Sequence, residues 1–129
     1  MRVCLDTSAY SQLRRGNAAL QECLEQADGI LLPAVVVGEL HAGFLAGSKV
    51  SANLKLLAEF LEQPGIGVQD VTREVAERYG LLVAQLRQAG TPIPTNDIWI
   101  AATALETGTR LVAYDGHFAQ VPGLLCLQP

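Results

Sequence analysis

Short apolar runs alternate along the chain with longer segments in which apolar residues recur every three or four positions. Apolar runs bounded by turn residues are typical of buried strands, and the longer periodic segments are typical of amphipathic helices. Strands are predicted at residues 3–5, 30–32, 66–68, 111–114 and 124–127. Helices are predicted at residues 7–15, 18–27, 33–46, 49–62, 72–89 and 95–107, several of them closed by a glycine.

This order of elements predicts the fold class. No two-residue hairpin turn joins consecutive strands, so the strands are expected to run parallel, with helices covering both faces of one sheet. The prediction is a single α/β/α sandwich with a mainly parallel central sheet. Helices 33–46 and 49–62 are expected to form a hairpin hinged at Gly47 and Ser48. The second of them carries an apolar stripe at Leu54, Leu57, Ala58 and Leu61.

Composition supports one compact domain spanning residues 1–129. Half of the 129 residues are hydrophobic, only 17% are charged, and the mean hydropathy is +0.25. A chain of this length and composition buries a sizeable core, which excludes disorder. No uncharged run is long enough to span a membrane, and Asp6 interrupts any signal-peptide region, so a cytoplasmic protein is expected. The net charge of −4 argues against nucleic-acid binding through a broad positive field.

The cysteines and histidines are too sparse for a zinc site. Cys4, Cys23 and Cys126 are odd in number and widely spaced, and they are interpreted as small buried thiols. No Cys-x-x-Cys pair exists, and only His41 and His117 are available as nitrogen ligands. Any metal is therefore expected to be held by oxygen.

Acidic residues stand where a parallel sheet places its ligand site. Asp6 directly follows the first predicted strand, Asp115 follows the fourth, and Asp97 lies in the first turn of helix 95–107. Ligands of such sheets bind at the carboxyl ends of the strands. Glu39 lies on an otherwise apolar or small helix surface, where an acid is unusual.

Each acid alone also has a structural explanation. Asp6 suits a helix N-cap, Asp97 favours the positive end of a helix, Asp115 before a glycine suits a turn, and Glu39 suits an ion pair. Together, four converging carboxylates repel one another unless a cation neutralises them. Mg²⁺ or Mn²⁺ fits that need, because both take carboxylate oxygens and leave positions open for a phosphate.

Three other enzyme classes are excluded by missing residues. Gly38 and Gly43 have the spacing of a P-loop, but Phe44 stands where the lysine is required. A phosphoacceptor receiver domain needs a lysine after a late strand, and the chain has only Lys49 and Lys55. No Gly-x-Ser-x-Gly turn is present for a serine hydrolase.

Five segments in a fixed order resemble a known family. They are Val-Cys-Leu-Asp-Thr-Ser-Ala (3–9), Val-Val-Gly-Glu-Leu-His-Ala-Gly (36–43), Thr-Asn-Asp-Ile-Trp-Ile-Ala-Ala-Thr-Ala (95–104), Leu-Val-Ala-Tyr-Asp-Gly-His-Phe (111–118) and Val-Pro-Gly-Leu (121–124). The chain resembles PIN-domain proteins, and among them the VapC-type toxin ribonucleases. Together the segments cover almost the whole chain, and the set is specific although each one is weak alone.

The resemblance implies a PIN-like fold and a Mg²⁺- or Mn²⁺-dependent endoribonuclease that cleaves structured RNA as the toxin of a toxin–antitoxin pair. It implies that Asp6, Glu39, Asp97 and Asp115 are the catalytic, metal-binding acids. Asn96 matches the position beside the third acid and is expected to orient that acid or cap the helix. The implied partners are RNA, a VapB-like antitoxin and a second copy of the chain in a homodimer, with no membrane.

Ala113 departs from the family pattern, which often has threonine or serine two residues before the last acid. The role of that hydroxyl is either missing or passes to Thr7 or Ser8. A non-catalytic PIN-fold scaffold that binds RNA or a partner is therefore the alternative function.

Three further expectations concern side chains near these motifs. Phe118 and Trp99 are expected to be core residues, and His117 is expected to be a structural histidine rather than a general base. The helix 95–107 is expected to be capped by Thr95 or Asn96. The hairpin of residues 34–62 is expected to offer the apolar groove for the antitoxin.

Overall fold

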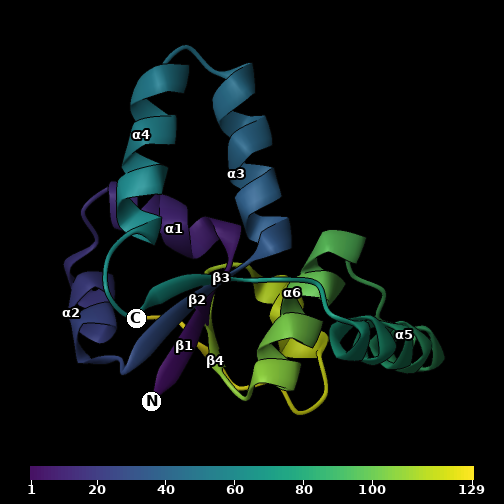
Figure 1. Cartoon of the computed structure of the whole chain (residues 1–129). Coiled ribbons are helices and arrows are strands. Elements are labelled where there is room, and N and C mark those ends of the chain that lie inside the picture. The colour runs from purple at the N-terminus through teal and green to yellow at the C-terminus, as the bar shows by residue number, and fades with distance from the viewer.

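The computed structural model describes all 129 residues and confirms the predicted parallel sheet (Figure 1). Five strands lie in the order β3-β2-β1-β4-β5, and every neighbouring pair is parallel. The register places Cys4 opposite Leu31 on one side and Leu111 on the other. The strands are β1 (Arg2–Leu5), β2 (Gly29–Pro33), β3 (Ile66–Gln69), β4 (Arg110–Val112) and β5 (Cys126–Leu127).

Six α-helices and one 3₁₀ helix connect the strands. Figure 1 shows α1 and α2 on one side of the sheet, α5 and α6 on the other, and α3 and α4 projecting together as a hairpin. Their bounds are α1 (Thr7–Arg14), α2 (Ala18–Gln26), α3 (Ala34–Ala46), α4 (Val50–Leu61), α5 (Arg73–Gln88), α6 (Thr95–Thr107) and the 3₁₀ helix η1 (Gly116–Gln120). No helix is both long and apolar enough to cross a membrane.

The start of α6 differs from the prediction. Neither Thr95 nor Asn96 caps it; Pro94 takes the cap position, with no side-chain hydrogen bond to the helix. Proline cannot donate a backbone N–H, and its fixed φ suits the chain entering a helix. At the other end, Gly108 adopts a φ of +66°. This left-handed conformation favours glycine and ends the helix where the sequence predicts.

The core lies between the sheet and its helices. Val3, Leu5, Leu32 and Leu111 are fully buried in the strands, and Phe118 is buried as predicted. Trp99 packs against the core from α6, and its ring stacks on Tyr79 of α5 with centroids 3.8 Å apart. The expectation that Trp99 is a packing residue is therefore confirmed.

Two burial predictions are wrong. In α4, Phe60 is buried whereas Ala58 is exposed, because the helix packs through Phe60 on the edge of the Tyr10 ring, with centroids 5.5 Å apart. Cys4 is buried, but Cys23 is half-buried and Cys126 is exposed. Cys126 lies on the two-residue strand β5 at the edge of the sheet, where little covers it.

Candidate active site

Two neighbouring strands, β1 and β4, and two helices, α3 and α6, position the four predicted acids. Asp6 follows β1 and Asp115 lies three residues beyond β4, and these strands are neighbours, so their carboxyl ends meet at one edge of the sheet. Asp97 is in the first turn of α6, and Glu39 lies in the middle of α3, which contacts α6. The fold thus directs all four acids toward one region, as the sequence predicts.

Asp6 is both a helix cap and a buried acid. Only 4% of the residue is exposed. Its Oδ1 accepts the Ala9 N–H at 2.8 Å and the Ser8 hydroxyl at 2.7 Å, and its Oδ2 lies 2.9 Å from the same hydroxyl. Ser8 Oγ also accepts the backbone N–H of Tyr114 at 3.0 Å. Ser8 therefore ties the end of β1 to the segment that carries Asp115.

Glu39 is held by the neighbouring elements. The Thr7 hydroxyl donates to Oε1 at 2.7 Å, and the Asn96 amide donates to Oε2 at 3.5 Å. Asn96 therefore faces Glu39 and neither caps α6 nor bonds to Asp97, which corrects its predicted role. Thr7 and Ser8 are the two residues expected to supply the hydroxyl that Ala113 lacks. Each of them donates a hydrogen bond to one acid of the site.

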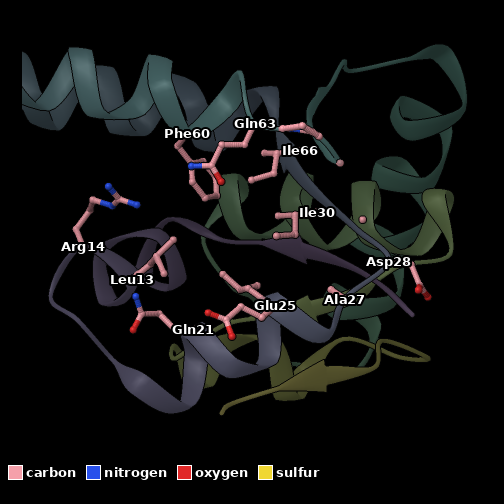
Figure 2. Close-up of a pocket in the computed structure, with 14 residues that line it drawn as sticks. Leu13, Arg14, Gln21, Glu25, Ala27, Asp28, Ile30, Phe60, Gln63 and Ile66 are labelled. Atoms are coloured by element: carbon pink, nitrogen blue, oxygen red, sulfur yellow. The ribbon is translucent and has the colours of Figure 1, made fainter.

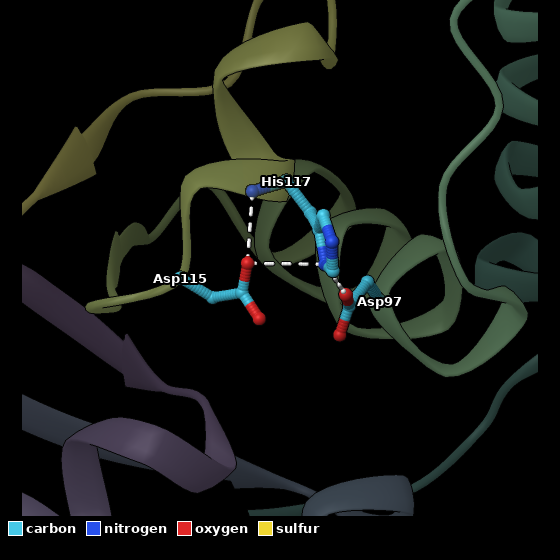
Figure 3. A group of neighbouring side chains, drawn as sticks. All are labelled: Asp97, Asp115 and His117. Carbon is cyan, nitrogen blue, oxygen red and sulfur yellow. Dashed lines mark hydrogen bonds and ion pairs between the residues drawn. The ribbon is translucent and has the colours of Figure 1, made fainter.

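Asp97, Asp115 and His117 form the tightest group in the site (Figure 3). His117 Nδ1 lies 2.8 Å from Asp97 Oδ2 and 3.0 Å from Asp115 Oδ1, and the His117 backbone N–H donates to Asp115 Oδ1 at 2.9 Å. One ligand atom from each residue lies within 4.8 Å of the other two. His117 thus lies among the predicted acids with its ring nitrogen hydrogen-bonded, and its assignment as a structural histidine rather than a general base stays a prediction.

The sequence carries a weak signal for this placement. His117 lies two residues after Asp115, and the short η1 helix begins between them, with Asp115 as its cap. The tight 3₁₀ turn places His117 beside Asp115, the residue that caps the helix. The periodicity of strands and helices does not reveal such a local turn. The spacing Asp-x-His, in Asp115 and His117, does indicate that the two side chains lie close together.

The acids carry excess negative charge. The pKa of Asp6 is raised from 3.8 to about 6; burial is the largest cause, the hydrogen bonds from Ser8 and Ala9 oppose it, and the charges of Asp97 and Asp115 add to it. Burial also raises the pKa of Asp97, with smaller contributions from Asp115 and Glu39. Burial is thus a larger cause than mutual repulsion. None of the four acids forms an ion pair with a lysine or arginine.

This donor set fits a divalent cation. Carboxylate oxygens are the hard ligands that Mg²⁺ and Mn²⁺ take, and the raised pKa values of Asp6 and Asp97 show that their negative charge is incompletely compensated. Asp97 and Asp115 present their oxygens beside each other. Asp6 and Glu39 lie outside this tightest group, and their charges act on it.

A separate cavity of about 410 Å³ lies away from the acids (Figure 2). Its walls come from α1, α2, the end of α4 and the starts of β2 and β3, so it lies toward the opposite ends of the strands. Figure 2 shows Leu13, Ile30, Phe60 and Ile66 around it, with Arg14 at its rim. Phe60 is the one lining residue that belongs to the hairpin of residues 34–62.

Comparison with known proteins agrees with the fold. The family model of the PIN domain matches residues 3–124. Ribonuclease VapC4 of Mycobacterium tuberculosis is 34% identical over 88 residues, which are 68% of each chain. Ribonuclease VapC5 of the same organism is 28% identical over 119 residues, covering 92% of this chain and 87% of the relative.

Solved structures give the same answer. VapBC2 from Rickettsia felis, bound to a DNA fragment from its promoter, includes a chain that superposes with a TM-score of 0.88 at 25% identity. The superposition covers 98% of both chains. The family model, the relatives and the superposition all indicate the same family. The chain belongs to the PIN-domain family and, within it, to the VapC group.

Proposed function

We propose that this protein is a Mg²⁺- or Mn²⁺-dependent endoribonuclease that acts as the toxin of a toxin–antitoxin pair. The observation that carries the proposal is the group of Asp97 and Asp115, with Asp6 and Glu39 beside it and no lysine or arginine to neutralise them. Membership of the VapC group supports RNA as the substrate, because the similar proteins of M. tuberculosis are ribonucleases.

The chain's own residues have distinct tasks in this proposal. Asp97 and Asp115 would hold the cation, and Asp6 and Glu39 would add negative charge beside it. Ser8 and Thr7 fix the carboxylates of Asp6 and Glu39 by hydrogen bonds. A bound divalent cation activates water as a nucleophile and stabilises the leaving oxygen of a phosphodiester. The hydrogen bonds preorganise the carboxylates, so little reorganisation is needed when RNA binds.

Structured RNA suits this site better than an extended strand. The chain has nine lysine and arginine residues, and three of them pair with acids on the surface. Affinity for any RNA backbone grows with the number of phosphates that basic residues neutralise. Because few lysine and arginine side chains are free of ion pairs, recognition of RNA by the shape of a loop or stem is favoured over recognition by charge.

A VapB-like antitoxin and a second copy of the chain complete the proposal. The similar chain of R. felis was solved as part of a VapBC assembly. The hairpin of α3 and α4 exposes Leu45 and Leu56, which offer apolar area to a partner. A basic antitoxin side chain near the four acids would neutralise them in place of the cation.

Cleavage by the Asp97→Asn variant tests the activity. The parent is expected to cut RNA with added Mg²⁺ or Mn²⁺ and to stop in excess chelator, whereas Asp97→Asn is expected to be inactive. Asp70→Asn is the matched control, because Asp70 is exposed and forms no ion pair. Mapping the cleavage sites on total RNA then identifies the target.

Thermal melting separates loss of chemistry from loss of structure. The pKa of Asp97 is raised mainly by burial, so its charge destabilises the metal-free protein at neutral pH. Asp97→Asn is therefore expected to melt no lower than the parent in chelator, and to lose the parent's rise in melting temperature on adding Mg²⁺. Cleavage that persists in chelator contradicts the proposal. RNA binding without cleavage under any metal supports the scaffold alternative.

A further inference from the structure

His117 places a nitrogen atom among the oxygens of the proposed metal site. Its Nδ1 is 2.8 Å from Asp97 Oδ2 and 3.0 Å from Asp115 Oδ1 (Figure 3). Adjacent ligands of an octahedral ion with bonds of about 2.1 Å lie about 3 Å apart. His117 Nδ1 therefore lies from each of the two oxygens at the spacing of neighbouring ligands of one small cation, which is also the spacing of hydrogen bonds when no cation is bound.

The imidazole is positioned by the chain on either side of it. The His117 backbone N–H donates to Asp115 Oδ1 at 2.9 Å, which fixes the start of η1 against the acid. The next residue, Phe118, is 2% exposed and anchors η1 in the core. The His117 side chain itself is 48% exposed. A cation and its water ligands thus have access to the ring without displacing core residues.

Nitrogen and oxygen donors select different cations. Carboxylates and water suit both Mg²⁺ and Mn²⁺, whereas imidazole is a ligand of first-row transition ions, a group that includes Mn²⁺ and not Mg²⁺. A neutral imidazole with its proton on Nε2 presents a lone pair at Nδ1, the atom that faces the two acids. One nitrogen in an otherwise oxygen site therefore favours Mn²⁺ over Mg²⁺.

We propose that His117 Nδ1 is a direct metal ligand together with Asp97 and Asp115, and that this nitrogen makes the site prefer Mn²⁺ to Mg²⁺. The inference rests on the proposed function, since it concerns the cation of the same site. It differs from the sequence prediction of a site held by oxygen alone. His41 is the other histidine of the chain, and it is exposed on α3 without a hydrogen bond to any of these acids.

Pulsed electron paramagnetic resonance of bound Mn²⁺ tests the ligand directly. The full-length protein with Mn²⁺ is expected to show electron spin-echo modulation from a coordinated ¹⁴N nucleus, and the coupling is expected to change when histidine is labelled with ¹⁵N. The measurement is made at a pH where free imidazole is neutral. The signal is expected to disappear in His117→Gln and to persist in the matched control His41→Gln.

Metal titrations test the selectivity. His117→Gln is expected to weaken Mn²⁺ binding at least about tenfold, the scale on which loss of groups around a metal affects affinity. Its Mg²⁺ affinity is expected to change much less, so the ratio of the two dissociation constants moves toward one. His41→Gln is expected to leave both constants unchanged. Melting in chelator checks that each variant is folded.

Each other outcome overturns a specific claim. Saturable Mn²⁺ binding without nitrogen coupling, or with coupling that survives in His117→Gln, refutes the ligand role of His117 and leaves the proposed function intact. Equal losses of Mg²⁺ and Mn²⁺ affinity in His117→Gln refute the selectivity. No saturable binding of either ion refutes the metal-dependent function together with this inference. The wild-type spectrum with labelled histidine shows whether a histidine is a ligand, and coupling that persists in His41→Gln identifies it as His117 even where His117→Gln misfolds.

Discussion

Replacing Asp6 with asparagine isolates the energetic effect of burying a charge at the site. Asparagine keeps the shape of the side chain and an oxygen that accepts from the Ala9 N–H and the Ser8 hydroxyl, so the cap of α1 is preserved. Its amide is able to donate to Ser8 Oγ in place of the lost acceptor. The substitution therefore removes the negative charge and changes the packing little.

The raised pKa sets the size of the effect. The pKa of Asp6 is about 6 in the folded protein against 3.8 for an unperturbed aspartate, and this difference corresponds to about 3 kcal/mol. The folded state holds its proton more tightly than the unfolded state. Protonation of Asp6 therefore stabilises the folded state. This contribution to stability is fully present below pH 3.8 and is lost as the pH rises through about 6. At neutral pH the metal-free parent therefore lacks stability that Asp6→Asn retains.

Thermal and urea unfolding in chelator measure this difference across pH. At about pH 8, Asp6→Asn is expected to be up to about 3 kcal/mol more stable than the parent, or roughly 10 °C higher in melting temperature. At about pH 3.5 the two proteins are expected to melt together, because Asp6 is protonated in both states of the parent. Asp70→Asn, at an exposed position, is expected to match the parent throughout.

Two results refute this reasoning. A variant that is less stable than the parent at every pH shows that the carboxylate is worth more as a helix cap than its burial costs. A gain that does not change with pH shows that the buried charge is not its source. High salt provides a further check, since burial is the largest cause of the raised pKa of Asp6. The gain is therefore expected to survive salt, which screens mainly exposed charges.

Two further predictions concern the hydroxyl bridge and the partner surface. Ser8→Ala leaves the Tyr114 N–H and Asp6 without their shared partner, so we expect about 1–3 kcal/mol lower stability by urea unfolding and reduced RNA cleavage; unchanged stability contradicts the bridge. Replacing exposed Leu45 and Leu56 together by lysine is expected to abolish copurification of a coexpressed antitoxin while RNA cleavage is retained, whereas the exposed α5 control Leu81→Lys binds as the parent does. Retained binding by the double variant contradicts the hairpin as the docking surface.

Elements with chemical signals at both ends were predictable from sequence. Helix α6 has the predicted bounds, since the Pro-x-Pro segment precedes it and Gly108 ends it. The strand predicted at 111–114 instead ends at Val112, because the Tyr114 N–H donates to Ser8 Oγ and not to a neighbouring strand. That contact joins residues 106 positions apart. Local pattern contains no information about a contact of this kind.

The site likewise combines features that the sequence predicts with contacts that only the assembled fold determines. The convergence of Asp6 and Asp115 follows from the parallel sheet, because acids after neighbouring parallel strands must meet at one edge. The places of Asn96 and His117 depend on side-chain directions in the assembled fold, where Asn96 turns to Glu39 and His117 lies between two acids. Residue type and spacing predict which elements meet, but not which side chains face each other once they do.

The burial of Asp6 connects the stability of the fold to its ligand. The residue is 4% exposed and its carboxylate accepts hydrogen bonds from Ser8 and Ala9, yet its pKa remains raised. Neutral donors therefore offset only part of the cost of that charge, and a positive charge is needed to offset the rest. A metal ion and a basic antitoxin side chain both supply one. Any group that binds this edge of the sheet as a cation is thus expected to stabilise the fold as it binds, and two such groups are expected to exclude each other.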